Sequence, residues 1–142
     1  RSVLQAIILT KDEQIVLTPT YHVFDLNKEH MGGKELECAI EADKTGTEKF
    51  RLDSVSASAS EKDGKITLTV SNLETDRAQE VRVTIEGEPI NAAEGRILSG
   101  RMDEYNDFGN SPLEVKPFTD FEIREGMLIL KMPACSVAEI RI

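Results

Sequence analysis

The fold class is decided by the stretch Val55–Ile85, VSASASEKDGKITLTVSNLETDRAQEVRVTI. Apolar and polar side chains alternate with a period of two in three parts of this stretch, as they do in antiparallel strands with one face on a core and the other in water. Asp63-Gly64 separates the first two parts and favours a tight turn between neighbouring strands. The pattern therefore predicts three antiparallel strands, at residues 55–60, 66–71 and 81–86.

Further short strands are predicted on both sides of this stretch. They cover residues 36–40, 121–123, 127–130 and 136–142. Seven or more short strands with regularly spaced turns, such as Glu125-Gly126, predict a mainly β fold, an antiparallel and jelly-roll-like β-sandwich over residues 36–142. The segment Arg101–Pro117 is rich in Asp, Asn, Gly and Pro. It is predicted to be the one long loop, a kind of segment that is often functional.

The first thirty residues have a different pattern. Val3–Thr10 is a nearly continuous apolar run, VLQAIILT, which is typical of a strand buried on both faces in a parallel sheet. Thr18 then fits the N-cap of a helix, and Pro19 fits its first position. Gly32 supplies a left-handed cap at the other end. Residues 1–31 are therefore predicted to form strand, loop and helix.

The composition excludes several kinds of partner. The chain has 142 residues, with 26 acidic against 17 basic residues and a formal charge of −9. Since it contains no block of Lys and Arg, neither nucleic acid nor an anionic membrane surface is an expected partner. The apolar run Ala6–Leu9 is too short to span a membrane. The lack of tryptophan and the count of two tyrosines argue against an aromatic platform for sugars.

Neither a cofactor, a metal nor a disulfide is expected. Cys38 and Cys135, the two cysteines, are predicted to be buried and reduced, because they form no dense framework and no signal peptide is evident. No Cys or His pair has the spacing of a zinc site. Because the chain opens at Arg1 without a Met, we expect it to be part of a longer protein. A targeting signal would lie upstream, so bacterial cytoplasm, periplasm and secretion all stay open.

The residues taken alone form no complete catalytic set. Most carboxylates lie on the polar faces of predicted strands or in turns, as expected of solvated surface. His22 and His30 are too far apart for the i, i+4 pairing of a helical metal site, and His22 lies in an apolar cluster typical of packing. The serines at positions 54–60 lack the glycine pattern of a nucleophile elbow. The chain is therefore not a complete enzyme.

Three parts of the chain together resemble one family. They are SVLQAIILT (Ser2–Thr10) with LTPTYHVF (Leu17–Phe24), the stretch Val55–Ile85 quoted above, and GRILSGRMDEYNDFGNSPLEVKP (Gly95–Pro117) with the closing SVAEIRI. In this order they are similar to the C-terminal portion of family 51 glycoside hydrolases. These enzymes are α-L-arabinofuranosidases, which remove terminal arabinofuranosyl units from arabinose-containing polysaccharides. The resemblance covers essentially the whole chain.

The resemblance implies two domains. Residues 1–31 would be the last strand and helix of a catalytic (β/α)8 barrel, whose parallel strands are buried on both faces. Residues 36–142 would be the C-terminal β-sandwich. In the family both catalytic residues are glutamates on earlier barrel strands, upstream of Arg1, and no glutamate here matches their motifs. The fragment is therefore expected to be inactive, while its full-length parent would be a retaining glycoside hydrolase and a homo-oligomer.

The resemblance also implies one substrate contact and one contact loop. Gln5 matches a glutamine of the last barrel strand that hydrogen-bonds arabinose in the family, and the alternative is that Gln5 bonds only backbone groups. Tyr105, Asn106 and Phe108 lie in the long loop, where the family has a similar Asn-x-Phe element. That loop either packs on the barrel or a neighbouring subunit, or is a self-contained surface loop.

Two functions of the sandwich remain open. It either buttresses the barrel of the same protein, or it is a non-catalytic carbohydrate-binding or protein-interaction module. Sugar-binding modules generally present aromatic faces to their ligands. The low aromatic content therefore favours the buttressing role, with the arabinose-containing oligosaccharide or polysaccharide bound by the barrel.

Overall fold

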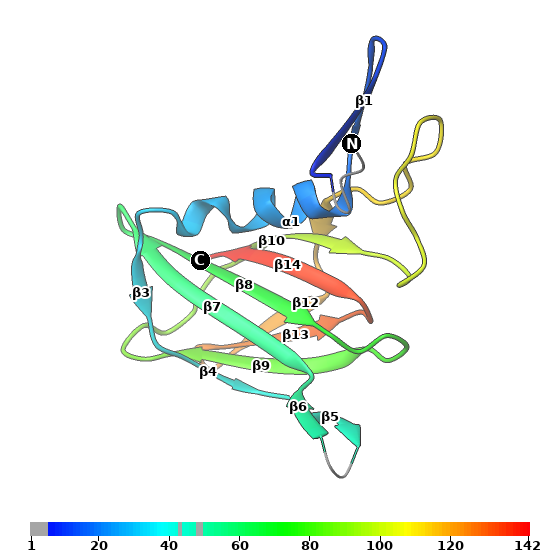
Figure 1. Ribbon diagram of the computed structural model, residues 1–142. Helices are drawn as coiled ribbons and strands as arrows, with labels where there is room; N and C mark the ends of the chain where they lie inside the picture. The colour runs from blue at the N-terminus through cyan, green and yellow to red at the C-terminus, as the bar shows by residue number, and fades with distance from the viewer. Residues whose placement is uncertain (1–5, 43, 48–49) are drawn as a thin grey trace.

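Two antiparallel sheets pack face to face and form a β-sandwich (Figure 1). The computed structural model describes residues 6–42, 44–47 and 50–142, with side chains for residues 6–42 and 53–142. The larger sheet consists, in order, of β11 (Lys116–Phe118), β10 (Glu94–Ser99), β14 (Ser136–Arg141), β8 (Lys65–Asn72), β7 (Val55–Lys62) and β3 (Lys34–Leu36). The smaller sheet consists, in order, of β12 (Phe121–Arg124), β13 (Met127–Met132), β9 (Gln79–Ile85) and β4 (Cys38–Glu41). The predicted mainly β, antiparallel fold is confirmed.

The core lies between the facing sides of the two sheets. Leu68 and Val70 of β8 belong to the same buried cluster as Val83 of β9 and Leu128 and Leu130 of β13, and all five are fully buried. Burial of side chains of this size contributes about 1.5–3 kcal/mol each. The alternation that predicted these strands therefore records the division between core and outer face.

Both predicted tight turns are present. The backbone φ angles are 53° at Asp63 and 75° at Gly64, between β7 and β8. They are 51° at Glu125 and 77° at Gly126, between β12 and β13. Two successive residues with positive φ match the right-handed twist of the strands that they join. These turns fix the register of the two hairpins.

A helix covers the outer face of the larger sheet. α1 (Pro19–Asn27) continues into the 3-10 helix η1 (Lys28–His30), and Figure 1 shows α1 lying across β10 and β14. Thr18 is the N-cap and its hydroxyl accepts a hydrogen bond from the Tyr21 amide, as predicted. Leu26 is fully buried in a second apolar cluster with Leu98 and Leu113. α1 therefore packs on the sandwich through a buried apolar cluster of its own.

The covered outer face corrects one prediction. The polar residues of β8 and β14 were expected to face water on the solvated side of the sheet. Instead Thr67, Thr69 and Glu139 are buried, because α1 and η1 lie over this face. A period of two shows which residues share a face, but it does not show whether a helix covers that face.

The structure of the N-terminal segment corrects the prediction of a strand buried in a parallel sheet. The described part of the predicted buried strand Val3–Thr10 does not lie in a parallel sheet. β1 (Ile8–Lys11) pairs instead with β2 (Gln14–Leu17) in an antiparallel hairpin, which projects beyond the start of α1 (Figure 1). Ile7 and Ile8 are each 45% exposed. A continuous apolar run indicates a surface suited to burial, but it does not identify what covers that surface.

Smaller differences concern the cysteines and the short strands. Cys38 and Cys135 are free thiols, as predicted, but both are half-buried rather than buried. The single strand predicted at residues 36–40 is divided between β3 and β4, which lie in different sheets. β10 and β11 were not predicted, and a separate hairpin joins β5 (Lys44–Thr47) to β6 (Phe50–Asp53).

Candidate functional site

The long loop after β10 is anchored by Asn106. This side chain is only 5% exposed. Its Nδ2 donates to the carbonyl oxygens of Leu113 at 2.6 Å and Leu17 at 2.9 Å, and its Oδ1 accepts from the Leu113 amide at 2.9 Å. Because Leu113 also packs in the cluster with Leu26 of α1 and Leu98 of β10, the loop is fixed to the helix and to the sandwich. The bond to Leu17, the last residue of β2, fixes it to the hairpin as well.

A second connection joins the hairpin to α1. The Thr18 amide donates to the carbonyl oxygen of Ile7 at 3.3 Å. The Thr18 hydroxyl lies 2.9 Å from the carbonyl oxygen of Ala6 and 2.8 Å from that of Ile7, and it can donate to one of them at a time. The base of the hairpin, the start of α1 and the loop therefore form one connected unit.

Exposed apolar side chains concentrate on this unit. Nine large hydrophobic residues are exposed among those described. Seven of them lie in the hairpin with its preceding residue, on α1 or in the loop: Ile7, Ile8, Ile15, Leu17, Phe24, Met102 and Tyr105. The other two are Met31 and Leu73. We call the surface formed by residues 7–24 and 101–112 the hairpin–loop surface.

A buried carboxylate fixes α1 to the larger sheet. The Glu139 side chain is 1% exposed, and its two oxygens each lie 2.6 Å from an arginine, Arg96 Nη2 and Arg141 Nε. Arg96 Nη1 lies 3.2 Å from Asp25 on α1. Hydrogen bonding from Lys28, and then from Arg96, lowers the pKa of the Asp25 carboxyl below its usual value. The helix is therefore held by charge as well as by apolar packing.

His30 adds a second polar contact beneath the helix. Its Nδ1 lies 2.7 Å from the Ser60 hydroxyl and its Nε2 lies 2.7 Å from that of Thr69. Burial lowers the pKa of the His30 imidazole, although the charge of Glu139 acts in the opposite direction. With both ring nitrogens hydrogen-bonded to sheet side chains, His30 is a packing residue.

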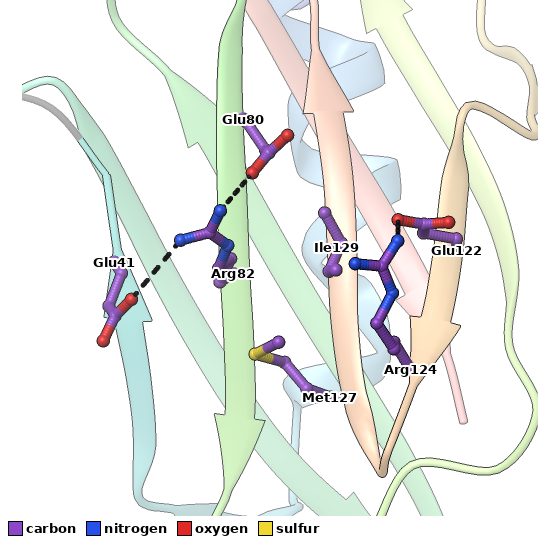
Figure 2. A pocket seen from close by; sticks show the side chains of 7 residues that line it. All are labelled: Glu41, Glu80, Arg82, Glu122, Arg124, Met127 and Ile129. Atoms are coloured by element: carbon purple, nitrogen blue, oxygen red, sulfur yellow. Dashed lines mark hydrogen bonds and ion pairs between the residues drawn. The ribbon is translucent and has the colours of Figure 1, made fainter.

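The outer face of the smaller sheet carries a shallow hollow of about 440 Å³ (Figure 2). Ile129 and Met127 form its floor. Glu80 pairs with Arg82 and Glu122 with Arg124, each at 2.7 Å, and all four side chains are about half exposed or more. Exposed ion pairs of this kind contribute little to stability. They are solvated surface, as the alternation predicted, and they do not resemble the rigidly held carboxyl pair of a glycosidase.

Neither a metal centre nor a membrane-spanning helix is found in the described part of the chain. It contains no group of three or more His, Cys, Asp or Glu side chains that could hold a metal ion. None of its helices has the length and apolar character needed to cross a membrane.

The structure separates the residues singled out in the sequence. Gln5 lies outside the described residues. Tyr105 is exposed, Asn106 is buried and Phe108 is half-buried. Asn106 therefore anchors the loop to the rest of the chain, whereas the side chain of Tyr105 is exposed to solvent. The contacts of Arg96 and Glu139 were not predicted, because they join residues far apart in the chain.

Comparison with known proteins gives the family. A family model described as "Alpha-L-arabinofuranosidase C-terminal domain" matches residues 2–136. The chain belongs to this family. The C-terminal domain is also 37% identical, over 99% of its length, to an "Intracellular exo-alpha-L-arabinofuranosidase" of Bacteroides ovatus, of which it covers 28%.

Solved structures agree with this assignment. The C-terminal domain is similar to part of the GH51 arabinofuranosidase from Xanthomonas axonopodis pv. citri, with a TM-score of 0.90 and 30% identity over 98% of this chain and 29% of that one. It also has the fold of part of a family 51 alpha-L-arabinofuranosidase from Bifidobacterium longum, with a TM-score of 0.81 at 17% identity, over 96% of this chain and 28% of that one. The domain thus spans less than a third of the length of these relatives.

Proposed function

We propose that this chain is an accessory domain that supports the catalytic barrel of an α-L-arabinofuranosidase and performs no catalysis itself. The observation that carries the proposal is the concentration of exposed apolar side chains on the hairpin–loop surface. Scattered apolar residues are normal on a protein surface, but a gathered set marks an interaction site. Since hydrogen bonds connect the hairpin, α1 and the loop, this surface is formed before any partner binds.

The barrel of the same polypeptide is the proposed occupant. The arabinofuranosidase relatives are more than three times as long as this chain, which matches 28% and 29% of their lengths. If residues 1–31 are the last strand and helix of the barrel, the hairpin begins at the end of that strand and α1 follows the hairpin. α1 then has two packing faces. Leu26 lies on the sandwich side, and Phe24, which is exposed in this chain, packs on the barrel.

The proposed division of labour places hydrolysis in the barrel. The carboxylates around the hollow of Figure 2, Glu41, Glu80 and Glu122, are exposed and each pairs with an arginine of the same sheet. Glutamates of the barrel would act as nucleophile and as acid/base in a retaining mechanism. Gln5 would contact the arabinose unit. Incubation of this chain with para-nitrophenyl α-L-arabinofuranoside is expected to release no nitrophenol, and release above background would contradict the proposal.

Docking is tested by placing a charge on the proposed contact surface of the full-length parent. Ile15 is 69% exposed in this chain, and Leu73, which lies away from the hairpin–loop surface, is 58% exposed. Ile15→Asp is expected to lower the melting temperature of the full-length protein by several degrees more than Leu73→Asp, because burial of an isoleucine is worth about 1.5–3 kcal/mol. In the isolated chain the two variants should melt alike. Equal effects in the full-length protein would refute docking at this surface.

The alternative role in sugar capture has its own outcome. Saturable binding of arabinan or arabinoxylan by the isolated chain would favour a carbohydrate-binding module. The accessory role predicts no such binding. The proposal also includes a homo-oligomeric parent enzyme, which light scattering of the full-length protein would check.

A further inference from the structure

We propose that the loop at residues 101–112 reaches the substrate cleft of the barrel, and that Tyr105 contacts the sugar units beyond the scissile bond. This inference rests on the proposed function, since it requires residues 1–31 to belong to the barrel. It adds a specificity-determining residue, supplied by the sandwich, to a site whose catalytic groups lie in another domain.

The hairpin of β1 and β2 has the position of a strand–helix connection in the proposed barrel. In a (β/α)8 barrel the segment between a strand and the following helix lies at the carboxyl end of the strands, where active sites are built. β1 takes the last residues of the expected barrel strand Val3–Thr10, so β1 and β2 lie in the sequence between the first part of that strand, residues 3–7, and α1, which begins at Pro19. The hairpin would therefore be the last strand–helix connection of the barrel, at the catalytic face.

The loop is hydrogen-bonded to the hairpin through Asn106. Asn106 donates to the carbonyl oxygen of Leu17 at 2.9 Å, across 89 positions of sequence. The other two hydrogen bonds of its side chain go to Leu113. In Figure 1 the hairpin and the loop project on the same side of the molecule, beyond the start of α1. The loop therefore lies where the hairpin lies, at the proposed catalytic face.

The loop exposes the side chain of Tyr105 to its surroundings. Tyr105 immediately precedes the buried anchor and is 69% exposed. At the start of the loop the Arg101 amide donates to Glu104 at 2.7 Å and the Arg101 guanidinium pairs with Asp103 at 2.7 Å, both within the loop and exposed. A tyrosine next to an anchored residue presents an aromatic ring with a hydroxyl at its tip, which combines an apolar face with a hydrogen-bonding group.

These features favour a saccharide as the ligand of Tyr105. Sugar rings present apolar C–H faces and hydroxyl groups together, and both would be met by one tyrosine. A single ring is not a platform, in agreement with the low aromatic content of the chain. It would serve one subsite, for the leaving part of an arabino-oligosaccharide, while the barrel binds the arabinose unit that is removed.

The test compares two substrates of the full-length enzyme. For the wild type, Tyr105→Phe, Tyr105→Ala and the remote control Leu73→Ala, kcat/KM is measured on a linear arabinofuranose trisaccharide and on para-nitrophenyl α-L-arabinofuranoside. The ratio of the trisaccharide value to the aryl value is expected to fall about fivefold or more in Tyr105→Ala, mainly through KM. Tyr105→Phe should keep most of the ratio, and Leu73→Ala all of it.

The outcomes separate the two proposals. A wild-type enzyme that hydrolyses both substrates, with a ratio that falls by less than this amount in Tyr105→Ala, refutes the role of Tyr105 and leaves the accessory function standing. A wild-type protein that hydrolyses neither substrate refutes the arabinofuranosidase assignment itself. Thermal melting of each variant shows whether a loss of activity reflects unfolding.

Discussion

Glu139 and Arg96 form an ion pair at 2.6 Å on the outer face of the larger sheet, beneath α1. Burial alone would lower the pKa of the Arg96 guanidinium, but the hydrogen bonds and charges of Glu139 and Asp25 together outweigh burial and raise this pKa. Arg96 also reaches Asp25 on the helix. This pair therefore connects the sheet to the helix that we place between the sandwich and the barrel.

Removal of the Glu139 charge should destabilise the chain. Glu139→Gln leaves Arg96 and Arg141 without their shared carboxylate, and the free energy of unfolding is expected to fall by about 1–3 kcal/mol. Urea titration would measure it. The matched control Glu122→Gln removes an exposed partner of Arg124 and should change stability by less than about 0.5 kcal/mol. Similar losses of unfolding free energy in both variants would show that the burial of Glu139 does not increase its contribution to stability.

Acid should weaken the chain through His30. The unfolded chain takes up a proton near the usual pKa of 6.5, whereas burial lowers the pKa of His30 in the folded chain. The unfolded state therefore binds more protons in this range, and stability present above about pH 6.5 is lost as the pH falls through the folded pKa. We expect the free energy of unfolding to fall between about pH 7 and pH 5.

Substitution of His30 should remove that part of the pH dependence. His30→Asn is expected to have a flatter stability profile over this range than the wild type, and His22→Asn, at a half-buried position of the preceding helix α1, is the control. Urea titrations at a series of pH values would measure the profiles. An unchanged slope in His30→Asn would assign the titration to another group.

Loss of the Asn106 anchor should loosen the loop. In Asn106→Ala the carbonyl oxygen of Leu17 and the polar backbone groups of Leu113 lose their hydrogen-bond partner. Stability is expected to fall by about 1–3 kcal/mol, and limited proteolysis should cut the loop sooner. Asn110→Ala, an exposed residue of the same loop, is the control. If both variants resist protease like the wild type, Asn106 is not the anchor.

The start of the loop should not tolerate a side chain at Gly100. An alanine Cβ there would overlap Cδ2 of Leu113 and lie 2.8 Å from Oε2 of Glu104. Leu113 is buried against Leu26 and Leu98, so Gly100→Ala is expected to cost about 1–3 kcal/mol. Ser99→Ala, at the exposed neighbouring position, should be nearly neutral. Thermal melting of both variants would check this, and a neutral Gly100→Ala would mean that the loop adjusts freely.

The features that could be predicted from the sequence are local ones. The alternation in β7, β8 and β9, the turns at Asp63-Gly64 and Glu125-Gly126 and the Thr18 cap depend on a few neighbouring residues. The burial of Glu139 and the anchoring by Asn106 depend on contacts between distant segments. The periodic pattern of apolar and polar residues along the chain does not reveal contacts between distant segments. The apolar run before Thr10 indicated a surface for burial but not its partner.

Hydrogen–deuterium exchange in the full-length parent, compared with the 142-residue chain, tests the docking of this domain most directly. We expect amides of the hairpin Ile8–Leu17 and of the loop Arg101–Asn110 to exchange more slowly in the full-length protein, while those of the turn Asp63-Gly64 exchange alike in both. Equal exchange of the hairpin and the loop in the two proteins would show that the hairpin–loop surface does not dock on the rest of the protein.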